Sequence, residues 1–556
     1  MHKAYDNFIK LAIQKLRRDT VSFSELKKNI CFELKLPMPT NADLREHYEK
    51  LIVQKIISGN PQLEKILLSR KIRTQSGVAV VAVLTKSYPC PGRCLYCPTE
   101  KNMPKSYLSN EPAVMRAITA KFNPYRQTQS RLRSLELNGH KTDKIELIVM
   151  GGTFSALPHY YQKRFIYQCF RACNNYGKSY KVHKAIKSIK LLDKKLLEEQ
   201  GKNETAKHRI IGLTLETRPD YINENEILNF RNLGCTRVEL GAQSLWNEIL
   251  QKNKRGHGVE ETVYATRLLK DAGFKVSYHM MPGLPGFSLK KDFLMFQKLF
   301  SDSSFQPDML KIYPTIVTRN SALYKLWRQG EYRPLTDNQF KKLILKIKTE
   351  VIPPYVRISR LVRDVPATSI AAGPKISNLR QLIVPESLCR CIRCREVRDN
   401  YLPKEKIILD RIDYPASGGR EIFLQYVSPD KKKLFALLRL RIPSNPNHFI
   451  PALRQAALVR EVHTYGKLKS IDVNGKKSLP ASLRSPEIAT SLRADEALPA
   501  GPQHFGLGKK LMAEAEKIAK KEFGLVNIAV ISGIGARGYY RKLGYSQKNG
   551  YMVKSI

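Results

Sequence analysis

The spacing of hydrophobic and polar positions changes along the chain, and these changes divide it into parts. Over residues 1–75, apolar side chains recur at helical intervals, as in DNFIKLAIQKL and LEKILLSRKI, and no stretch has the pattern of a strand. This part carries 15 Lys and Arg against 8 acidic residues. The pattern predicts a small, basic, helical N-terminal domain.

Between residues 76 and 384, short apolar runs alternate with longer stretches of helical periodicity. The runs, in chain order, are GVAVVAVLTK, KIELIVMGG, RIIGLTLETRP, TRVELGAQS, KVSYHMMPG and MLKIYPT. Such alternation is typical of parallel strands joined by crossover helices. We therefore expect an α/β domain whose sheet is either open or a partial barrel.

The pattern changes again after a cysteine-rich segment that we place at residues 385–415. Residues 416–556 contain strand-like runs that favour antiparallel pairing, REIFLQYVS, KLFALLRLRIP and ALVREVHTYGKL, then a long helix from about Gly508 and the strand VNIAVIS. Residues 467–502 are polar, basic and rich in Ser, Pro and Ala, which predicts a mobile loop within this second α/β domain.

Length and composition are those of a globular protein with several domains. The chain has 556 residues, 42% hydrophobic and 26% charged, which is too long for one core. The apolar run at residues 78–84 is far shorter than the ~20 residues that span a bilayer. The N-terminus lacks the apolar core of a secretory signal, so we expect a cytoplasmic location.

The charge balance indicates a polyanionic partner. The chain carries 96 Lys and Arg against 49 Asp and Glu, an excess of 47 positive charges. A nucleic-acid backbone is the partner that such an excess favours, although a solvated basic surface or anionic lipid is an alternative. Residues 178–208, with nine Lys against four acids, form a basic insertion that could contact such a backbone.

Six of the ten cysteines fall in two clusters. Because no secretory signal is present, clustered cysteines indicate metal binding rather than disulfides. The other four, Cys31, Cys169, Cys173 and Cys235, lie in apolar patterns and are expected in the core.

The first cluster, CPGRCLYCP, has three thiols at Cys90, Cys94 and Cys97. A four-iron cluster normally takes four thiolates, so three leave one iron open to another ligand. The open iron can bind the amino and carboxylate groups of S-adenosylmethionine, whose reductive cleavage yields a 5′-deoxyadenosyl radical. A zinc site with a remote fourth ligand is the alternative.

Several longer motifs carry a family resemblance. CPGRCLYCP resembles the radical S-adenosylmethionine signature, and EPAVMRAI, IVMGGTFSALP, GLTLETRPDY, GCTRVELGAQS, DAGFKVSYHMMPGLPG and LKIYPT are similar, in order, to the elongator protein three family, the catalytic subunit of Elongator. The resemblance runs over nearly the whole chain. It implies a radical SAM partial (β/α) barrel followed by an acetyltransferase domain of the GNAT type.

The resemblance also implies roles for individual residues of the barrel. The cluster ligands would be Cys90, Cys94 and Cys97. Contacts to S-adenosylmethionine would come from Gly151, Gly152, Glu216, Gln243 and Arg255. A carboxylate, an amide and a guanidinium suit the hydroxyl, amino and carboxylate groups of that molecule.

In the C-terminal domain, QHFGLGKKLM resembles the Q-x-x-G-x-G/A loop that holds the pyrophosphate of acetyl-CoA at a helix N-terminus. This places Gln503, His504, Phe505, Gly506, Leu507 and Gly508 at the cofactor. In GARGYYRKLGY, Tyr539 and Tyr540 match the tyrosine pair of the family near the thioester, with core packing as the alternative.

The second cluster, CRCIRCRE, places Cys389, Cys391 and Cys394 within six residues of a basic linker. Three thiolates at this spacing predict a structural zinc site that joins the two α/β domains, with a fourth ligand that the sequence does not identify.

The resemblance implies that the substrate is the wobble uridine of tRNA and that acetyl-CoA supplies carbon. The radical would take a hydrogen atom from the acetyl methyl group, and the resulting carbon radical would add to carbon five of the base. Loss of one electron and one proton from the adduct, then thioester hydrolysis, would leave 5-carboxymethyluridine. Lys311 and Tyr313 would lie at a strand end in contact with tRNA or acetyl-CoA, with Lys311 as a catalytic candidate. An electron donor and other Elongator subunits are possible partners, and the N-terminal domain would bind tRNA.

Two other classes of function remain open. The first is a protein lysine acetyltransferase with a structural iron-sulfur domain, for which Glu461 or His463 would be the general base. The excess of positive charge opposes it, because basic protein tails would be repelled. The second is a non-catalytic tRNA-binding scaffold, which would need none of the three motifs at Cys90, Glu216 and Gly506.

Overall fold

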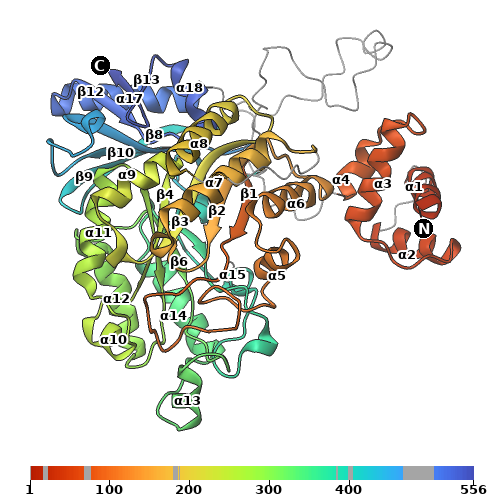
Figure 1. Ribbon diagram of the computed structural model, residues 1–556, viewed down its shortest axis with the longest axis horizontal. Coiled ribbons are helices and arrows are strands. Elements are labelled where there is room, and N and C mark those ends of the chain that lie inside the picture. Colours follow the sequence, from red (N-terminus) through yellow and green to blue (C-terminus); the bar gives the residue numbers. More distant parts are fainter. Residues whose placement is uncertain are drawn as a thin grey trace.

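A computed structural model describes residues 2–16, 23–67, 77–178, 186, 188–383, 386–398, 405–466 and 506–556. The N-terminal part is helical and has a small core of its own, set to one side of the molecule in Figure 1. Phe8, Ile30 and Tyr48 are fully buried in it, and Thr40 caps the third helix through the backbone N–H of Asp43. The helices are α1 (His2–Lys15), α2 (Phe23–Glu33), α3 (Asn41–Val53) and α4 (Pro61–Leu67).

A seven-stranded sheet follows, and every neighbouring pair of its strands is parallel. The strands lie in space in the order of the sequence, which is the order of a half-barrel. The six strands expected from the apolar runs are confirmed, and a seventh, β7, follows them. The strands are β1 (Ala79–Leu84), β2 (Lys144–Met150), β3 (Arg209–Thr217), β4 (Arg237–Gln243), β5 (Lys275–Met280), β6 (Met309–Ile312) and β7 (Arg357–Arg360).

Helices cover the outer face of the half-barrel (Figure 1). The helix after β3 is typical: the Asn223 side chain accepts from the backbone N–H of Glu226 at its start, and Gly234, at φ 89°, ends it. Part of the basic segment 178–208 forms α8, which packs on α7. The helices of this part of the chain, on the outer face and elsewhere, are α5 (Pro112–Thr119), α6 (Pro124–Leu137), α7 (His159–Asn174), α8 (Ile189–Asn203), α9 (Glu224–Leu233), α10 (Asn247–Lys252), α11 (Val259–Asp271), α12 (Leu289–Ser301), α13 (Leu323–Arg328), α14 (Asp337–Glu350), α15 (Leu379–Ile383) and α16 (Ile392–Arg395).

The C-terminal part is a second seven-stranded sheet in the order β13-β14-β12-β11-β10-β9-β8. The antiparallel pairing expected for its first long strands is confirmed, whereas β11 and β12 run parallel. Strand β8 begins at Ile408, inside the segment expected to be linker, because it pairs along its length with β9. The elements are β8 (Ile408–Ala416), β9 (Gly419–Val427), β10 (Leu434–Ile442), β11 (Ala456–Thr464), α17 (Leu507–Phe523), β12 (Asn527–Val530), α18 (Arg537–Arg541), β13 (Ser546–Lys548) and β14 (Tyr551–Ser555).

The second sheet docks on the ends of the half-barrel strands where those strands begin. A Cβ on Gly533 would lie 2.0 Å from the carbonyl oxygen of Ile211, near the start of β3. At the first residue of β5, Lys275 forms an ion pair of 3.1 Å with Glu461 of β11. The second sheet therefore lies at the amino ends of the parallel strands, opposite their carboxyl ends.

The four scattered cysteines, Cys31, Cys169, Cys173 and Cys235, are buried as expected. The loop expected at residues 467–502 lies outside the described residues. Among the helices that the structure describes, none combines the length and the apolar character needed to cross a membrane.

Candidate functional site

The loop after β1 carries the first three cysteines at the carboxyl end of the half-barrel. Cys90, Cys94 and Cys97 are each half-buried, and the N–H of Cys97 donates to the carbonyl of Cys94 across a tight turn, 3.2 Å away. A Cβ on Gly92 would lie 2.4 Å from Nη1 of Arg218, so the loop passes close to the end of this arginine side chain. The thiols line one cavity together.

The three thiols of this loop are not gathered as tightly as ligands of a single ion. Two groups of potential ligands in the described part of the chain have atoms within 4.8 Å of one another, and neither includes Cys90, Cys94 and Cys97. Thiolates that bind separate irons stand farther apart than thiolates on one ion. Burial, with smaller contributions from Cys94 and Cys90, raises the pKa of the Cys97 thiol to about 11. A cationic metal cluster would offset this preference for the neutral thiol.

Two glycines after β2 bring the backbone close to the cysteine loop. Gly151 has φ +146°, and a Cβ there would lie 2.0 Å from Oγ1 of Thr85. Gly152 has φ +94° and lines the cavity, whereas Gly151 packs against Thr85. Both positions therefore require glycine.

The side chains expected to hold S-adenosylmethionine converge on the same cavity from β3, β4 and the loop after α10. Glu216 accepts from the Tyr107 hydroxyl at 2.6 Å, and Gln243 Oε1 is buried without a hydrogen-bond partner. Arg255 places Nη1 3.5 Å from the sulfur of Cys94 and donates from Nη2 to the carbonyl of Gly241 at 2.6 Å. The structure thus brings Glu216, Gln243 and Arg255 to the wall of one cavity with the three thiols.

A buried ionic group at the middle of the sheet was not anticipated from sequence. Lys311 of β6 bonds Glu239 of β4 and lies 3.7 Å from Glu216, while His279 of β5 lies 3.1 Å from Glu239. Burial opposes the charged form, but the Glu239 carboxylate raises the pKa of Lys311 above its usual value. Glu216, Glu239 and His279 could reach one metal ion, yet the Lys311 ammonium already supplies the positive charge there.

A signal for this group was present in the sequence. Arg237 and Glu239 alternate within the otherwise apolar run TRVELGAQS, which places both on one face of β4. Charged residues on the inner face of a buried strand need partners, and the neighbouring strands provide them.

The other end of the cavity lies in the C-terminal sheet, where two parallel strands separate. Strands β11 and β12 pair only from Ala456 to Val459, and β11 continues to Thr464 without β12 beside it. Gly508, in the first turn of α17, faces this opening: a Cβ there would lie 3.1 Å from the Tyr539 hydroxyl. Gly506 takes φ +86°, as a glycine at a helix start can.

Tyr539 is 37% exposed and lines the cavity, while Tyr540 is buried, with the two rings 5.2 Å apart. Leu507 is buried in the first turn of α17. The remaining residues of the expected acetyl-CoA loop, Gln503, His504 and Phe505, lie outside the described residues.

One cavity of about 2030 Å³ joins the two ends. From the carboxyl to the amino ends of the barrel strands, its wall runs from Cys94 and Gly152 past Glu239 and Lys275 to Gly508 and Tyr539. A strand of seven residues such as β4 is about 20 Å long, which sets the scale of the separation. The arrangement can hold two different groups and expose both to one shared space.

The second cysteine cluster is compact and separate. The thiols of Cys389, Cys391 and Cys394 lie within 4.8 Å of one another, with the first two residues buried and the third exposed. No fourth His, Cys, Asp or Glu joins them at this distance in the part of the chain that the structure describes. The N–H of Ile392 donates to Val356, just before β7, and Val397 donates to Leu434 of β10, so the segment bridges the two sheets.

Comparisons with known proteins cover most of the chain. Residues 85–296 match the radical SAM superfamily, and residues 307–388 match the radical SAM C-terminal domain. The chain is 45% identical over 510 residues to the tRNA uridine(34) acetyltransferase of Methanocaldococcus infernus, with 88% of each chain covered. It is 37% identical over 529 residues to Elongator complex protein 3 of Homo sapiens, covering 91% of this chain and 90% of that one.

A solved structure has the same architecture. The archaeal Methanocaldococcus infernus Elp3 with an N-terminal deletion superposes with a TM-score of 0.69 at 42% identity, covering 86% of this chain and 99% of that one. The likeness therefore extends over most of the chain.

Proposed function

Because the chain belongs to the Elongator complex protein 3 family of radical SAM proteins, we propose that it modifies the wobble uridine of tRNA with carbon from acetyl-CoA, forming 5-carboxymethyluridine. The observation that carries the proposal is the single cavity that links Cys94 at one end to Tyr539 at the other. A protein lysine acetyltransferase would have no use for that connection.

The cysteine end has the ligand set for an iron-sulfur cluster. Cys90, Cys94 and Cys97 line the cavity together and provide three thiolates, one fewer than a four-iron cluster normally takes, which would leave one iron for S-adenosylmethionine. When bound, the pair supplies a carbon-centred radical that removes a hydrogen atom from a nearby methyl group.

This chain's own residues would orient S-adenosylmethionine. The guanidinium of Arg255, already 3.5 Å from the Cys94 sulfur, is placed to meet a carboxylate beside the cluster. Gln243 offers a buried amide oxygen that has no protein partner. The Tyr107 hydroxyl fixes one oxygen of Glu216, and the other, 3.7 Å from the Lys311 ammonium, could also accept a hydroxyl or amino proton.

The opening between β11 and β12 is our candidate for the thioester. The first turn of α17 presents backbone N–H groups there, and Gly506 and Gly508 lack side chains that would obstruct a pyrophosphate. The Tyr539 hydroxyl lies beside Gly508, where it can donate a hydrogen bond to the acyl group, and Tyr540 supports its ring. These features favour a GNAT-type acetyltransferase domain.

We assign Cys389, Cys391 and Cys394 to a structural zinc ion. Three thiols within 4.8 Å of one another match the compact geometry of zinc thiolates. The segment that carries them bonds both sheets, so the ion would stabilise the junction between the domains and take no part in the chemistry.

The enzyme should transfer deuterium from acetyl-CoA to 5′-deoxyadenosine. Acetyl-CoA with a deuterated methyl group, incubated with reduced protein, S-adenosylmethionine and tRNA, should yield labelled deoxyadenosine by mass spectrometry. Transfer should require tRNA, because alignment of reacting groups can supply up to about 7–11 kcal/mol of a barrier. Replacing Gly506 and Gly508 with bulky residues should abolish it. Unlabelled deoxyadenosine together with acetylated protein would instead support the lysine acetyltransferase.

Binding of tRNA should weaken steeply with salt. The excess of 47 positive charges favours many phosphate contacts, and each contact releases counterions. A plot of log affinity against log salt concentration, measured by filter binding, should have a slope of magnitude at least ~3. A flat response would assign the basic surface to a different partner.

A further inference from the structure

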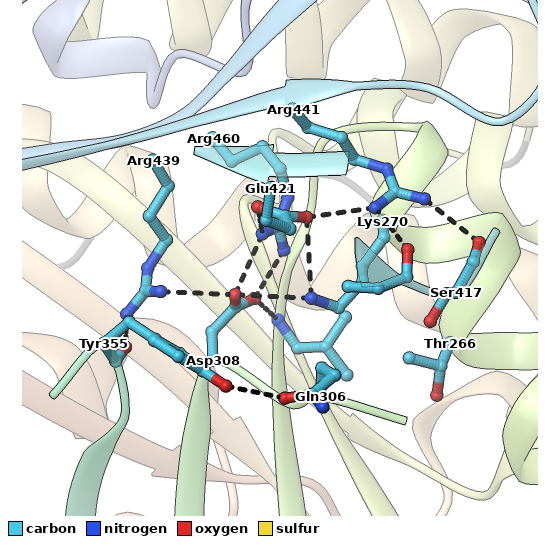
Figure 2. Close-up of polar contacts among 12 residues, drawn as sticks. Thr266, Lys270, Gln306, Asp308, Tyr355, Ser417, Glu421, Arg439, Arg441 and Arg460 are labelled. Atoms are coloured by element: carbon cyan, nitrogen blue, oxygen red, sulfur yellow. Dashed lines mark hydrogen bonds and ion pairs between the residues drawn. The ribbon is translucent and has the colours of Figure 1, made fainter. Parts of the chain in front are cut away.

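A cluster of buried charges lies where the second sheet docks on the half-barrel (Figure 2). Asp308 and Lys270 of the half-barrel are fully buried, as are Arg441 and Arg460 of the second sheet. The full set, which we term the interdomain charge cluster, is Lys270, Asp271, Lys275, Asp308, Glu421, Arg439, Arg441, Arg460 and Glu461.

The ion pairs of the cluster cross between the domains in both directions. From the second sheet, Arg460 bonds Asp308, and Arg441 lies 2.7 Å from Asp271 at the end of α11. From the half-barrel, Lys270 Nζ lies 3.5 Å from Glu421 of β9. Each domain therefore supplies both cations and anions to the other.

A bulge in the second sheet sends two consecutive side chains across the interface. The register between β10 and β11 shifts after the pair Arg439 and Glu461, so Arg460 and Glu461 both point toward the half-barrel. Arg460 donates to the carbonyl of Phe274 at 2.7 Å as well as to Asp308, and Glu461 pairs with Lys275 at 3.1 Å. In a regular strand, one of the two would face the other side.

Such a cluster determines geometry more strongly than it adds stability. Two apolar faces can slide past each other at low cost, whereas buried charges are all satisfied in few arrangements. Any shift that separates Arg460 from Asp308 leaves both charges without water or partner.

The anchored strands carry residues of both cavity ends. Asp308 directly precedes β6, which bears Lys311 three residues later, beside Glu216. Arg460 precedes Val462 by two residues on β11, and Val462 lies 3.9 Å from the position of a Cβ on Gly508. The contact between Asp308 and Arg460 therefore sets how the two ends of the cavity face each other.

We propose that the interdomain charge cluster is a positioning device that holds the acetyl end of the cavity in register with the cysteine end. The inference rests on the proposed function, because it assigns the cluster a role in joining the two half-sites. Its residues act through β6 and β11 and need not touch substrate.

The test uses three substitutions that remove one carboxylate charge each without changing side-chain size. Glu421→Gln removes a central charge, which contacts Arg460 at 3.0 Å. Asp271→Asn removes a charge at the edge of the cluster, and this milder variant keeps the test possible if Glu421→Gln does not fold. The matched control is Glu522→Gln, because Glu522 pairs at 2.6 Å with Arg411 within the second sheet's own domain.

The first readout needs no bound cofactor. Spin labels placed through unnatural amino acids at Tyr264 on α11 and Lys517 on α17, both exposed, report the distance between the domains by pulsed electron resonance. We expect a narrow distribution in the wild-type protein and in Glu522→Gln. Both cluster variants should broaden or shift it.

The second readout is the ratio of modified uridine to 5′-deoxyadenosine formed. In the cluster variants this ratio should fall by at least about tenfold, because a small misplacement of reacting groups lowers the reaction rate by that factor or more. Binding of acetyl-CoA and of S-adenosylmethionine should remain at wild-type values. The control should match wild type in all measurements.

Two outcomes would overturn the proposal. An unchanged distance distribution and ratio in Asp271→Asn and in folded Glu421→Gln would show that the cluster does not position the domains. If the ratio of modified uridine to 5′-deoxyadenosine stays constant while the folded fraction falls, the interdomain charge cluster contributes to stability alone. If wild-type protein forms no modified uridine, the proposed function fails, and the distance measurement still decides the role of the cluster.

Discussion

Cys94→Ala is expected to remove iron-sulfur absorbance and cleavage of S-adenosylmethionine while the protein stays folded. Cys94 is half-buried at the cavity wall, so its loss leaves no large void. Each thiolate of a three-cysteine site holds one iron, and two thiolates retain such a cluster poorly. Anaerobic reconstitution followed by ultraviolet-visible spectroscopy and chromatography of 5′-deoxyadenosine measures both effects.

Cys169→Ala is the matched control. This thiol lies on the buried face of α7 and does not line the cavity, and burial raises its pKa to about 12, so it is inert at neutral pH. The variant should bind the cluster and cleave S-adenosylmethionine as wild type does. If Cys94→Ala cleaves S-adenosylmethionine as fast as the wild type does, this loop is not the site of the radical chemistry.

Lys311→Met is expected to lower the free energy of unfolding by about 3 kcal/mol, because it leaves a buried carboxylate short of its main partner. Lys311 bonds Glu239, which is 2% exposed. Without Lys311, the cationic or ionisable partners of that carboxylate among the described residues are His279 at 3.1 Å and Arg237 at 3.7 Å. The pKa of Lys311 is raised and that of Glu239 lowered, so both are charged at pH 7. Urea unfolding at that pH measures the loss.

Two variants separate this effect from loss of a lysine in general. Lys291→Met removes an exposed pair with Glu248, 3.4 Å apart, and should cost less than about 1 kcal/mol. Lys311→Met combined with Glu239→Gln should be more stable than Lys311→Met alone, because no unpaired charge remains. If the two changes simply add, the pair does not contribute as the structure indicates.

Raising the pH tests the same pair. Because the folded state raises the pKa of Lys311, the pair contributes fully below the unfolded pKa of about 10.4 and is lost as pH rises through the folded value. Stability of the wild type should therefore decline more above pH 10 than that of Lys311→Met.

Most strands were predictable because their apolar runs are long and bounded by polar turns. β1 and β2 are of this kind, and both lie where the sequence places them. β7 was missed because its four residues, RISR, contain a single apolar side chain, Ile358, and so show no apolar run. β8 was missed because its exposed edge carries Asp and Arg, and only pairing with β9 makes it a strand.

The residues that line the cavity were predictable where a sequence motif lies at the end of a strand. Gly152, Glu216 and Gln243 each follow or end a parallel strand, and the carboxyl ends of neighbouring strands meet at one edge. Tyr107 escaped prediction because it sits in an irregular loop, and its contact with Glu216 joins positions 109 residues apart.

The sequence by itself determined the alternation of strands and helices, the grouping of the cysteines and the excess of positive charge. Each of these is a property of neighbouring residues or of composition, and local periodicity and chemistry are enough to read them. The interdomain charge cluster was decided only by the tertiary structure. Arg439 and Arg441 look in sequence like the solvated face of a strand, yet both are buried, because their carboxylate partners include Asp308 and Asp271 of the other domain. A charge can be buried only where a distant part of the chain supplies its partner, and that meeting is a property of the folded molecule.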